Sequence, residues 1–230
     1  SFVGQFNLAD MVKAGFQQDF IAPVFPETGM LLFFCTESAW GNFLEDRGSV
    51  RIIYFDCNPR HLRLAATPED LSQAAVYTPR AVSLTQEKTL PPFESFYFTD
   101  HHDLPIFLEG LTPTQSKALG RLNRKLDQLY DRLGETRHRL CGHPDLIQSE
   151  MQWRCQMLAH GMEPNKVDLN REAELRKGIP DWQLLLQVDS DPKLGTRWGR
   201  NSQGRYYFWI RKQDLLDRNF NYPWGILQTF

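Results

Sequence analysis

Few parts of the sequence combine residue types and spacing that could support catalysis. Asp189, Ser190 and Asp191 place two carboxylates and a hydroxyl on one predicted loop, which could bind a cation or serve as acid and base. The stretch lacks the glycine and the distal glutamate of a calcium-binding loop, and aspartate before proline is typical of turns. We therefore interpret it as a turn.

Two other stretches place histidine beside a candidate nucleophile or metal ligand. Cys141-Gly142-His143 puts a thiol and an imidazole two residues apart, but side chains so close in sequence seldom meet in attack geometry. Gly142 and Pro144 favour a structural loop instead. His101-His102-Asp103 could supply metal ligands, yet neighbouring side chains on an extended chain point in opposite directions. The sequence thus predicts no catalytic residue, no metal site and no cofactor.

Three glutamines, Gln5, Gln187 and Gln228, are unusual because they lie in predicted apolar strands. A buried amide without partners costs roughly 1 to 3 kcal/mol, so each must find hydrogen bonds. The favoured interpretation is that each side chain bridges backbone groups where strands splay. The alternative is that Gln5 and Gln187 line a ligand cleft between two sheet units.

Aromatic residues are dense near the end of the chain. Both faces of the predicted strand Tyr206 to Ile210 are apolar, so most of these aromatics are predicted to lie in the core. Trp198 differs, because it lies in a polar loop beside Arg197 and Arg200. We predict that Trp198 is an exposed or cleft-lining anchor for a partner, since aromatic and Arg side chains dominate binding energy at interfaces.

The elements that position these residues follow a pattern that occurs twice. In each copy a Gln lies in an apolar strand, Asn or Asp follows two residues later, and a glycine opens the next strand. The predicted strands are Phe2 to Asn7, Met30 to Thr36 and Val50 to Cys57, then Gln183 to Asp189, Gly204 to Ile210 and Gly225 to Thr229. This pattern predicts an internal duplication, with unit one at about 1–57, unit two at about 182–230, and Gln5 matching Gln187.

The middle of the chain, about 112–178, is predicted to be helical. Thr112 is a good N-cap, and Pro113 suits the first helical position. Apolar residues then recur at helical spacing as far as Leu133. The helix is predicted to bury Leu122, Leu126 and Leu129 and to expose Arg121, Lys125 and Arg132. Sheets from both ends and helices from the middle, packed on one side, predict an α+β fold in a single domain, 1–230.

Composition restricts the partners and the compartment. The 26 basic and 28 acidic residues give a net charge of -2, which argues against a broad phosphate-binding face and therefore against nucleic acid. The longest apolar runs have only about a third of the roughly 20 residues that a membrane span requires, which argues against a membrane-spanning segment. Four cysteines, without zinc-site spacing, are predicted to be free thiols, and we expect a cytoplasmic protein.

The sequence resembles a known family. The stretch from Trp182 to Asp191, followed by Trp198-Gly199, Gly204 to Arg211, Asp214-Leu215 and Gln228, closely resembles the YwqG-like family, a bacterial family whose domain has no assigned function. His138 to Gln148 looks like its Gly-x-Pro-x-x-Ile-Gln segment, and Gly4 to Leu8 looks like its first strand. Members commonly have an acidic residue after the Trp-Gly pair, whereas this chain has Arg200, which argues against a cation-binding role for that loop.

The resemblance implies binding instead of turnover. The family offers no catalytic residues to carry over, and some relatives resemble immunity or partner proteins encoded beside secreted toxins. The leading hypothesis is therefore a non-enzymatic protein-binding module, of which an immunity-type partner of a toxin is one form. The alternative is an enzyme or small-ligand binder that uses a cleft between the two units, with Gln5, Gln187, Asp189 and His143 converging there.

Overall fold

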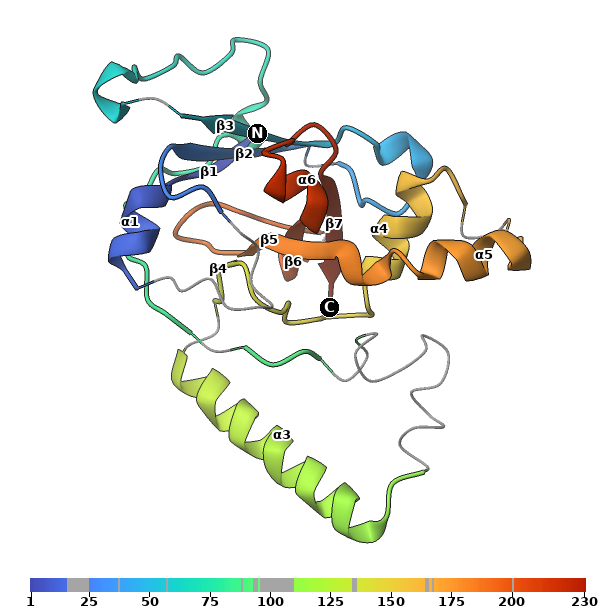
Figure 1. The fold of residues 1–230 in the computed structure, drawn as a ribbon. Helices are drawn as coiled ribbons and strands as arrows, with labels where there is room; N and C mark the ends of the chain where they lie inside the picture. Colours follow the sequence, from blue (N-terminus) through green and yellow to red (C-terminus); the bar gives the residue numbers. More distant parts are fainter. Residues whose placement is uncertain are drawn as a thin grey trace.

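Two antiparallel sheets form the centre of the molecule (Figure 1). The computed structural model describes residues 1–15, 25–36, 38–56, 58–87, 89–92, 95, 110–133, 136–163, 166, 168–199 and 201–230. The N-terminal sheet contains β1 (Phe2–Asn7), β2 (Met30–Cys35) and β3 (Val50–Phe55). The C-terminal sheet contains β4 (Arg139–Leu140), β5 (Trp182–Asp189), β6 (Gly204–Arg211) and β7 (Trp224–Thr229). The predicted α+β fold is confirmed.

Helices lie between and around the sheets. The α-helices are α1 (Leu8–Lys13), α3 (Pro113–Leu133), α4 (Gln152–Ala159), α5 (Leu169–Arg176) and α6 (Lys212–Leu216). Short 3-10 turns are η1 (Leu44–Asp46), η2 (Pro59–His61), η3 (Gln73–Ala75) and η4 (Ile179–Asp181). No helix in the described part of the chain is both long and apolar enough to cross a membrane.

The main core lies between the two sheets. Strand side chains alternate between the two faces of a sheet, and on the inner faces of β2 and β6 the alternate residues are apolar. The rings of Phe33 and Phe208 meet with centroids 5.3 Å apart and nearly perpendicular planes. Both residues are fully buried, and α1 and α6 close the same core with Leu8 and Leu215. This packing fills the space between the two predicted units.

The strands β1 to β3 pair with one another in the same register as the strands β5 to β7 do in the other sheet. Gln5 lies opposite Leu32, and Gln187 lies opposite Tyr207. In each pair the register shifts shortly before the glutamine, between Phe2 and Gly4 in β1 and between Leu184 and Leu186 in β5. The backbone also repeats one hydrogen bond: Leu8 N donates to Gly29 O, and Ser190 N donates to Gly204 O. A common origin of the two units stays a prediction.

The start of α3 agrees with the sequence. Thr112 Oγ1 accepts a hydrogen bond from the backbone N–H of Gln115, and Gln115 Oε1 accepts one from the N–H of Thr112. This reciprocal pair is a capping box, which satisfies donors that the first helical turn leaves free.

The predicted packing of α3 is wrong at Leu122. Figure 1 shows α3 standing apart from both sheets, and the Leu122 side chain is 40% exposed. Arg121 and Lys125 are exposed as predicted. The side chains of Leu126, Leu129 and Arg132 lie outside the described residues. Helical periodicity identifies the apolar face of a helix but does not specify which surface that face contacts.

The cysteine prediction is confirmed where the structure describes it. Cys35, Cys141 and Cys155 are buried and take part in no disulfide. Cys57 lies outside the described residues.

The contact between the sheets predicts the effect of a core substitution. Phe208→Ala should lower the free energy of unfolding by roughly 3 to 5 kcal/mol, because it leaves a cavity against Phe33. The matched control Phe43→Ala, at a side chain that is 55% exposed, should stay within about 0.5 kcal/mol. Urea titrations of both variants give the comparison, and equal midpoint shifts would contradict the assigned core.

Candidate functional site

Gln187 anchors a covering segment to the outer face of the C-terminal sheet. Its side chain is fully buried. Its Oε1 accepts a hydrogen bond from the backbone N–H of Asp145 at 2.9 Å, and its Nε2 donates to the carbonyl of Arg137 at 2.9 Å. One amide on β5 therefore binds backbone groups on both sides of β4.

Gln228 on β7 also binds backbone groups of the covering segment, further along the chain. Its Oε1 accepts from the backbone N–H groups of Ile147 at 3.0 Å and Gln148 at 3.1 Å, and its Nε2 donates to the carbonyl of Ser149 at 2.6 Å. The interpretation of strand glutamines as backbone bridges is confirmed for Gln187 and Gln228. Gln5 differs, because its side chain is exposed.

Charged residues that the sequence analysis missed complete this polar cluster. The Asp145 carboxylate pairs with Arg139 at 3.0 Å. The backbone carbonyl of Asp145 accepts hydrogen bonds from Tyr207 Oη at 2.6 Å and Arg205 Nη1 at 3.0 Å. Arg205 Nε donates to Asp189 Oδ1 at 2.6 Å. A charged side chain within an apolar strand, such as Arg205, was the available signal, because such a charge must be paired when it is buried.

The cluster is electrostatically compensated. Asp189 also accepts a hydrogen bond from the backbone N–H of Arg137 at 2.6 Å. Burial raises the pKa of Asp189 above its ordinary value, while Arg205 and the N–H of Arg137 act in the opposite direction. Each buried carboxylate thus has an Arg partner, as expected when the pair holds a loop in place.

Cys141 and His143 do not form a nucleophile and its base. Burial raises the pKa of the Cys141 thiol well above its ordinary value, so the reactive thiolate is scarce at neutral pH. Burial, together with Arg139, lowers the pKa of His143. Cys141 and Gly142 both have positive φ, and the N–H of His143 donates to Thr89 Oγ1 at 2.9 Å. These features fit the structural loop that the sequence analysis favoured.

The stretch from Asp189 to Asp191 builds the turn that leads into the β5–β6 loop. Ser190 Oγ accepts hydrogen bonds from the backbone N–H groups of Trp198 at 2.9 Å and Gly204 at 3.2 Å. Asp191 Oδ1 accepts from the N–H of Lys193 at 2.8 Å. Within the described ranges, no three His, Cys, Asp or Glu side chains are grouped so that they could hold a metal ion. His101-His102-Asp103 lies outside those ranges.

The prediction of Trp198 as an exposed anchor is wrong. Trp198 is 2% exposed, and its ring lies 5.2 Å from that of Tyr206 and 5.6 Å from that of Tyr77. The Ser190 hydroxyl holds the backbone of Trp198, and the indole turns into the core. Arg197 is exposed, and Arg200 lies outside the described residues. The polar composition of the loop indicated that the loop lies at the surface, but it did not predict that the Trp198 side chain points into the core.

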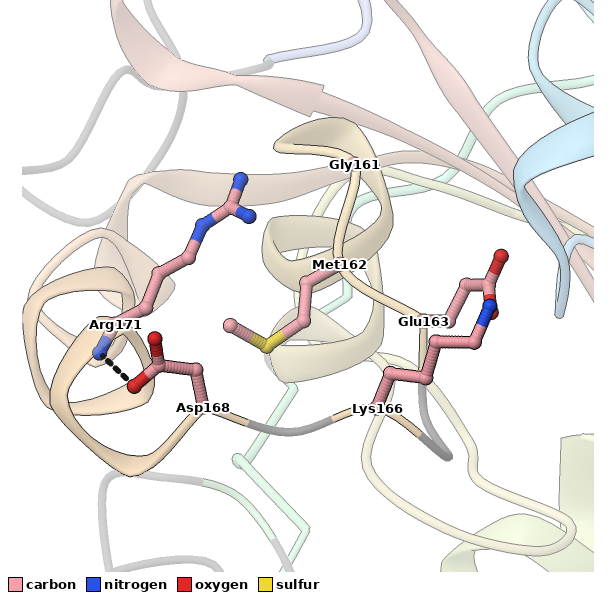
Figure 2. A pocket seen from close by; sticks show the side chains of 6 residues that line it. All are labelled: Gly161, Met162, Glu163, Lys166, Asp168 and Arg171. Carbon is pink, nitrogen blue, oxygen red and sulfur yellow. Dashed lines mark hydrogen bonds and ion pairs between the residues drawn. The ribbon is translucent and has the colours of Figure 1, made fainter.

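A depression at the turn between α4 and α5 has polar walls (Figure 2). Its lining residues are Gly161, Met162, Glu163, Lys166, Asp168 and Arg171. The Asp168 carboxylate accepts hydrogen bonds from the backbone N–H groups of Asn170 and Arg171, which caps α5. Glu163 and Lys166 pair at 2.7 Å. The carboxylates of this depression are therefore used in local structure.

The outer faces of the two sheets differ in what covers them. On the C-terminal sheet, Tyr207, Trp209 and Ile226 are buried, and α4 packs over them with Cys155 and Leu158.

The N-terminal sheet has equivalent positions on its own outer face. By register, Leu32 corresponds to Tyr207 and Phe34 to Trp209. In the described part of the chain, Phe2 is 43% exposed, Phe55 is 41% exposed and Gln5 is exposed. Leu32, Phe34 and Ile53 are half-buried. We call this surface, Phe2, Gln5, Leu32, Phe34, Ile53 and Phe55, the open face.

Residues 1–228 match the family described as domain of unknown function (DUF1963), and the chain belongs to this family. A search of curated proteins found no match. The YwqG-like relationship stays a prediction.

The role of Gln228 predicts a stability loss on truncation. Gln228→Ala should lower the free energy of unfolding by roughly 2 to 4 kcal/mol, because it leaves two N–H groups and one carbonyl without their partner. The exposed Gln203 gives a matched control, and Gln203→Ala should stay within about 0.5 kcal/mol. Hydrogen exchange should accelerate at the amides of Ile147 and Gln148 in the Gln228 variant alone; unchanged exchange there would contradict the bridge.

Glu150 predicts a pH dependence of stability. It accepts hydrogen bonds from the backbone N–H groups of Gln152 and Trp153, yet burial raises its pKa to about 7, from 4.5 ordinarily. Between these values the folded state binds more protons than the unfolded chain, so this group's contribution to stability is present at low pH and is lost as pH rises through about 7.

Glu150→Gln keeps one of the two acceptor oxygens and removes this titration. The free energy of unfolding of the native protein, minus that of the variant, should therefore be larger at pH 5 than at pH 7.5 by about 1 to 3 kcal/mol. Denaturant titrations across this pH range measure the difference, and parallel stability curves would refute the assignment.

Proposed function

We propose that the chain is a non-enzymatic protein-binding module that holds a segment of another protein on its open face. The observation that carries this proposal is the contrast between the two outer faces. Tyr207 and Trp209 are covered by α4, whereas the equivalent Leu32 and Phe34 are only half-buried. Apolar side chains gathered on a surface favour association with another protein.

Gln5 indicates how such a segment would be held. The equivalent Gln187 binds one N–H and one carbonyl of the segment that covers its own sheet. An exposed amide at the same strand position can offer the same acceptor and donor to an extended chain. Phe2 and Phe34, whose ring centroids lie 5.4 Å apart, offer the apolar contact beside it. We infer that the partner contributes an extended stretch with apolar side chains.

The cleft alternative has less support. Gln5 lies on the outer face of one sheet and Gln187 on the outer face of the other, with the core around Phe33 and Phe208 between them. Asp189 and His143 belong to the cluster that contains Gln187, through Arg205 and Arg139. The four residues therefore do not converge on one cleft. Some relatives of the YwqG-like family resemble immunity proteins, which makes a secreted toxin one candidate partner.

Affinity capture from the native host tests the proposal. Phe2→Ser should reduce capture of the partner at least about tenfold, because it removes an exposed aromatic contact, and Gln5→Ala should reduce it several-fold. Hydrogen exchange of the captured complex should slow at the amides of β1 and its neighbours.

Matched controls carry the same substitutions elsewhere. Phe43→Ser and Gln203→Ala change exposed side chains away from the open face and should leave capture unchanged. A partner that binds both open-face variants as well as the native chain would refute the proposal.

A further inference from the structure

The helix α3 has a regular leucine pattern that no contact in the described structure explains. Leucines occur at 119, 122, 126, 129 and 133, so the spacing alternates between three and four residues. This alternation places them at the a and d positions of a heptad repeat, the seam of a two-helix coiled coil. Leu119 is half-buried and Leu122 is 40% exposed. The seam is therefore open where the structure describes it.

The described side chains of this long helix show little of the packing that usually stabilises a helix. Helices in proteins are stabilised mainly by packing of their apolar face, and isolated helices gain little from intrinsic propensity. The capping box at Thr112 fixes the start of α3, but no described side chain of the helix is buried. Figure 1 shows the helix projecting from the body. The leucine spacing and the exposed Leu122 point to a partner that packs along the seam.

The charge of α3 indicates the chemistry of that partner. The helix contains five basic residues, Lys117, Arg121, Arg124, Lys125 and Arg132, against Asp127 and Asp131, in a chain of net charge -2. Lys125 and Arg132 occupy the g positions that flank the seam, and Lys125 is exposed. Charges at e and g positions select the partner helix of a coiled coil, and basic residues there favour acidic ones opposite.

We propose that α3 forms a two-helix coiled coil with an acidic amphipathic helix of another protein. The leucine seam supplies the apolar contact, and Lys125 pairs with carboxylates that flank the partner's seam. A second copy of this chain fits less well. In an antiparallel pair the g positions face each other, so lysine would meet arginine or lysine, and in a parallel pair Lys125 would face the uncharged Tyr130.

This proposal depends on α3 alone. The open face lies on the N-terminal sheet, whereas α3 stands apart from both sheets (Figure 1). Variants of one surface therefore leave the other unchanged, and each proposal can fail separately.

The test titrates the full chain with two synthetic peptides of the length of α3, both with leucine at a and d. One carries glutamate at every e and g position and the other carries lysine there, so that each peptide repels itself and stays monomeric. Fluorescence anisotropy of labelled peptide measures binding. The glutamate peptide should bind at least about tenfold more tightly than the lysine peptide, and its binding should weaken as salt is raised.

Two pairs of substitutions locate the contact. Leu122→Asp should weaken binding of the glutamate peptide at least about tenfold, while Gln128→Asp adds the same charge off the seam and should have little effect. Lys125→Glu should weaken it about threefold or more, whereas Arg124→Glu, on the far side of the helix, should change it less. Thermal melts check that the sheets remain folded in each variant.

Three results would overturn the proposal. Equal binding of the two peptides would show that charge does not select the partner, and binding of neither would show that α3 is not a docking helix. Sedimentation that reveals a dimer of the native chain, lost in Leu122→Asp, would identify a second copy as the occupant.

Discussion

The rest of the structure depends on the apolar contact between the two sheets. Phe33 and Phe208 meet at its centre, and the inner faces of β2 and β6 supply most of the surrounding core. Side chains alternate along a strand, so an apolar inner face leaves every second residue for the outside. That constraint places Gln5, Gln187 and Gln228 on outer faces. Whether each glutamine side chain is buried or exposed depends on what covers the outer face of its sheet.

On the C-terminal sheet the covering segment and its polar anchors require each other. Burying backbone groups of residues 145–149 is favourable only if each finds a partner, and Gln187, Gln228, Arg205 and Tyr207 supply those partners. The stretch Asp145 to Ser149 is therefore the part of the chain that these side chains bind. Its polar groups and these side chains bond to one another, as in a well-fixed loop.

Local pattern was sufficient for most of the elements and insufficient for their surroundings. The apolar pattern located every strand of the described structure except the two-residue β4, and the Thr112 cap located the start of α3. The same reasoning treated Gln5 and Gln187 alike, although one is exposed and the other is fully buried. The prediction for Trp198 was wrong for a related reason, because one ring of a polar loop can still be buried in the core. Each failure concerns contacts between residues far apart in sequence, which no local window contains.

The equivalence of Phe33 and Phe208 has a consequence for valency. By register these two residues occupy the same position in β1 to β3 and β5 to β7, and they touch each other, as equivalent residues do across the two-fold axis of a homodimer. An arrangement of that kind would present two like surfaces pointing in opposite directions. Because α4 covers one of them, only the surface on the N-terminal sheet is left open in the described structure. Under the proposed function, the open face would therefore cap a single copy of the partner and would not link two copies into a chain.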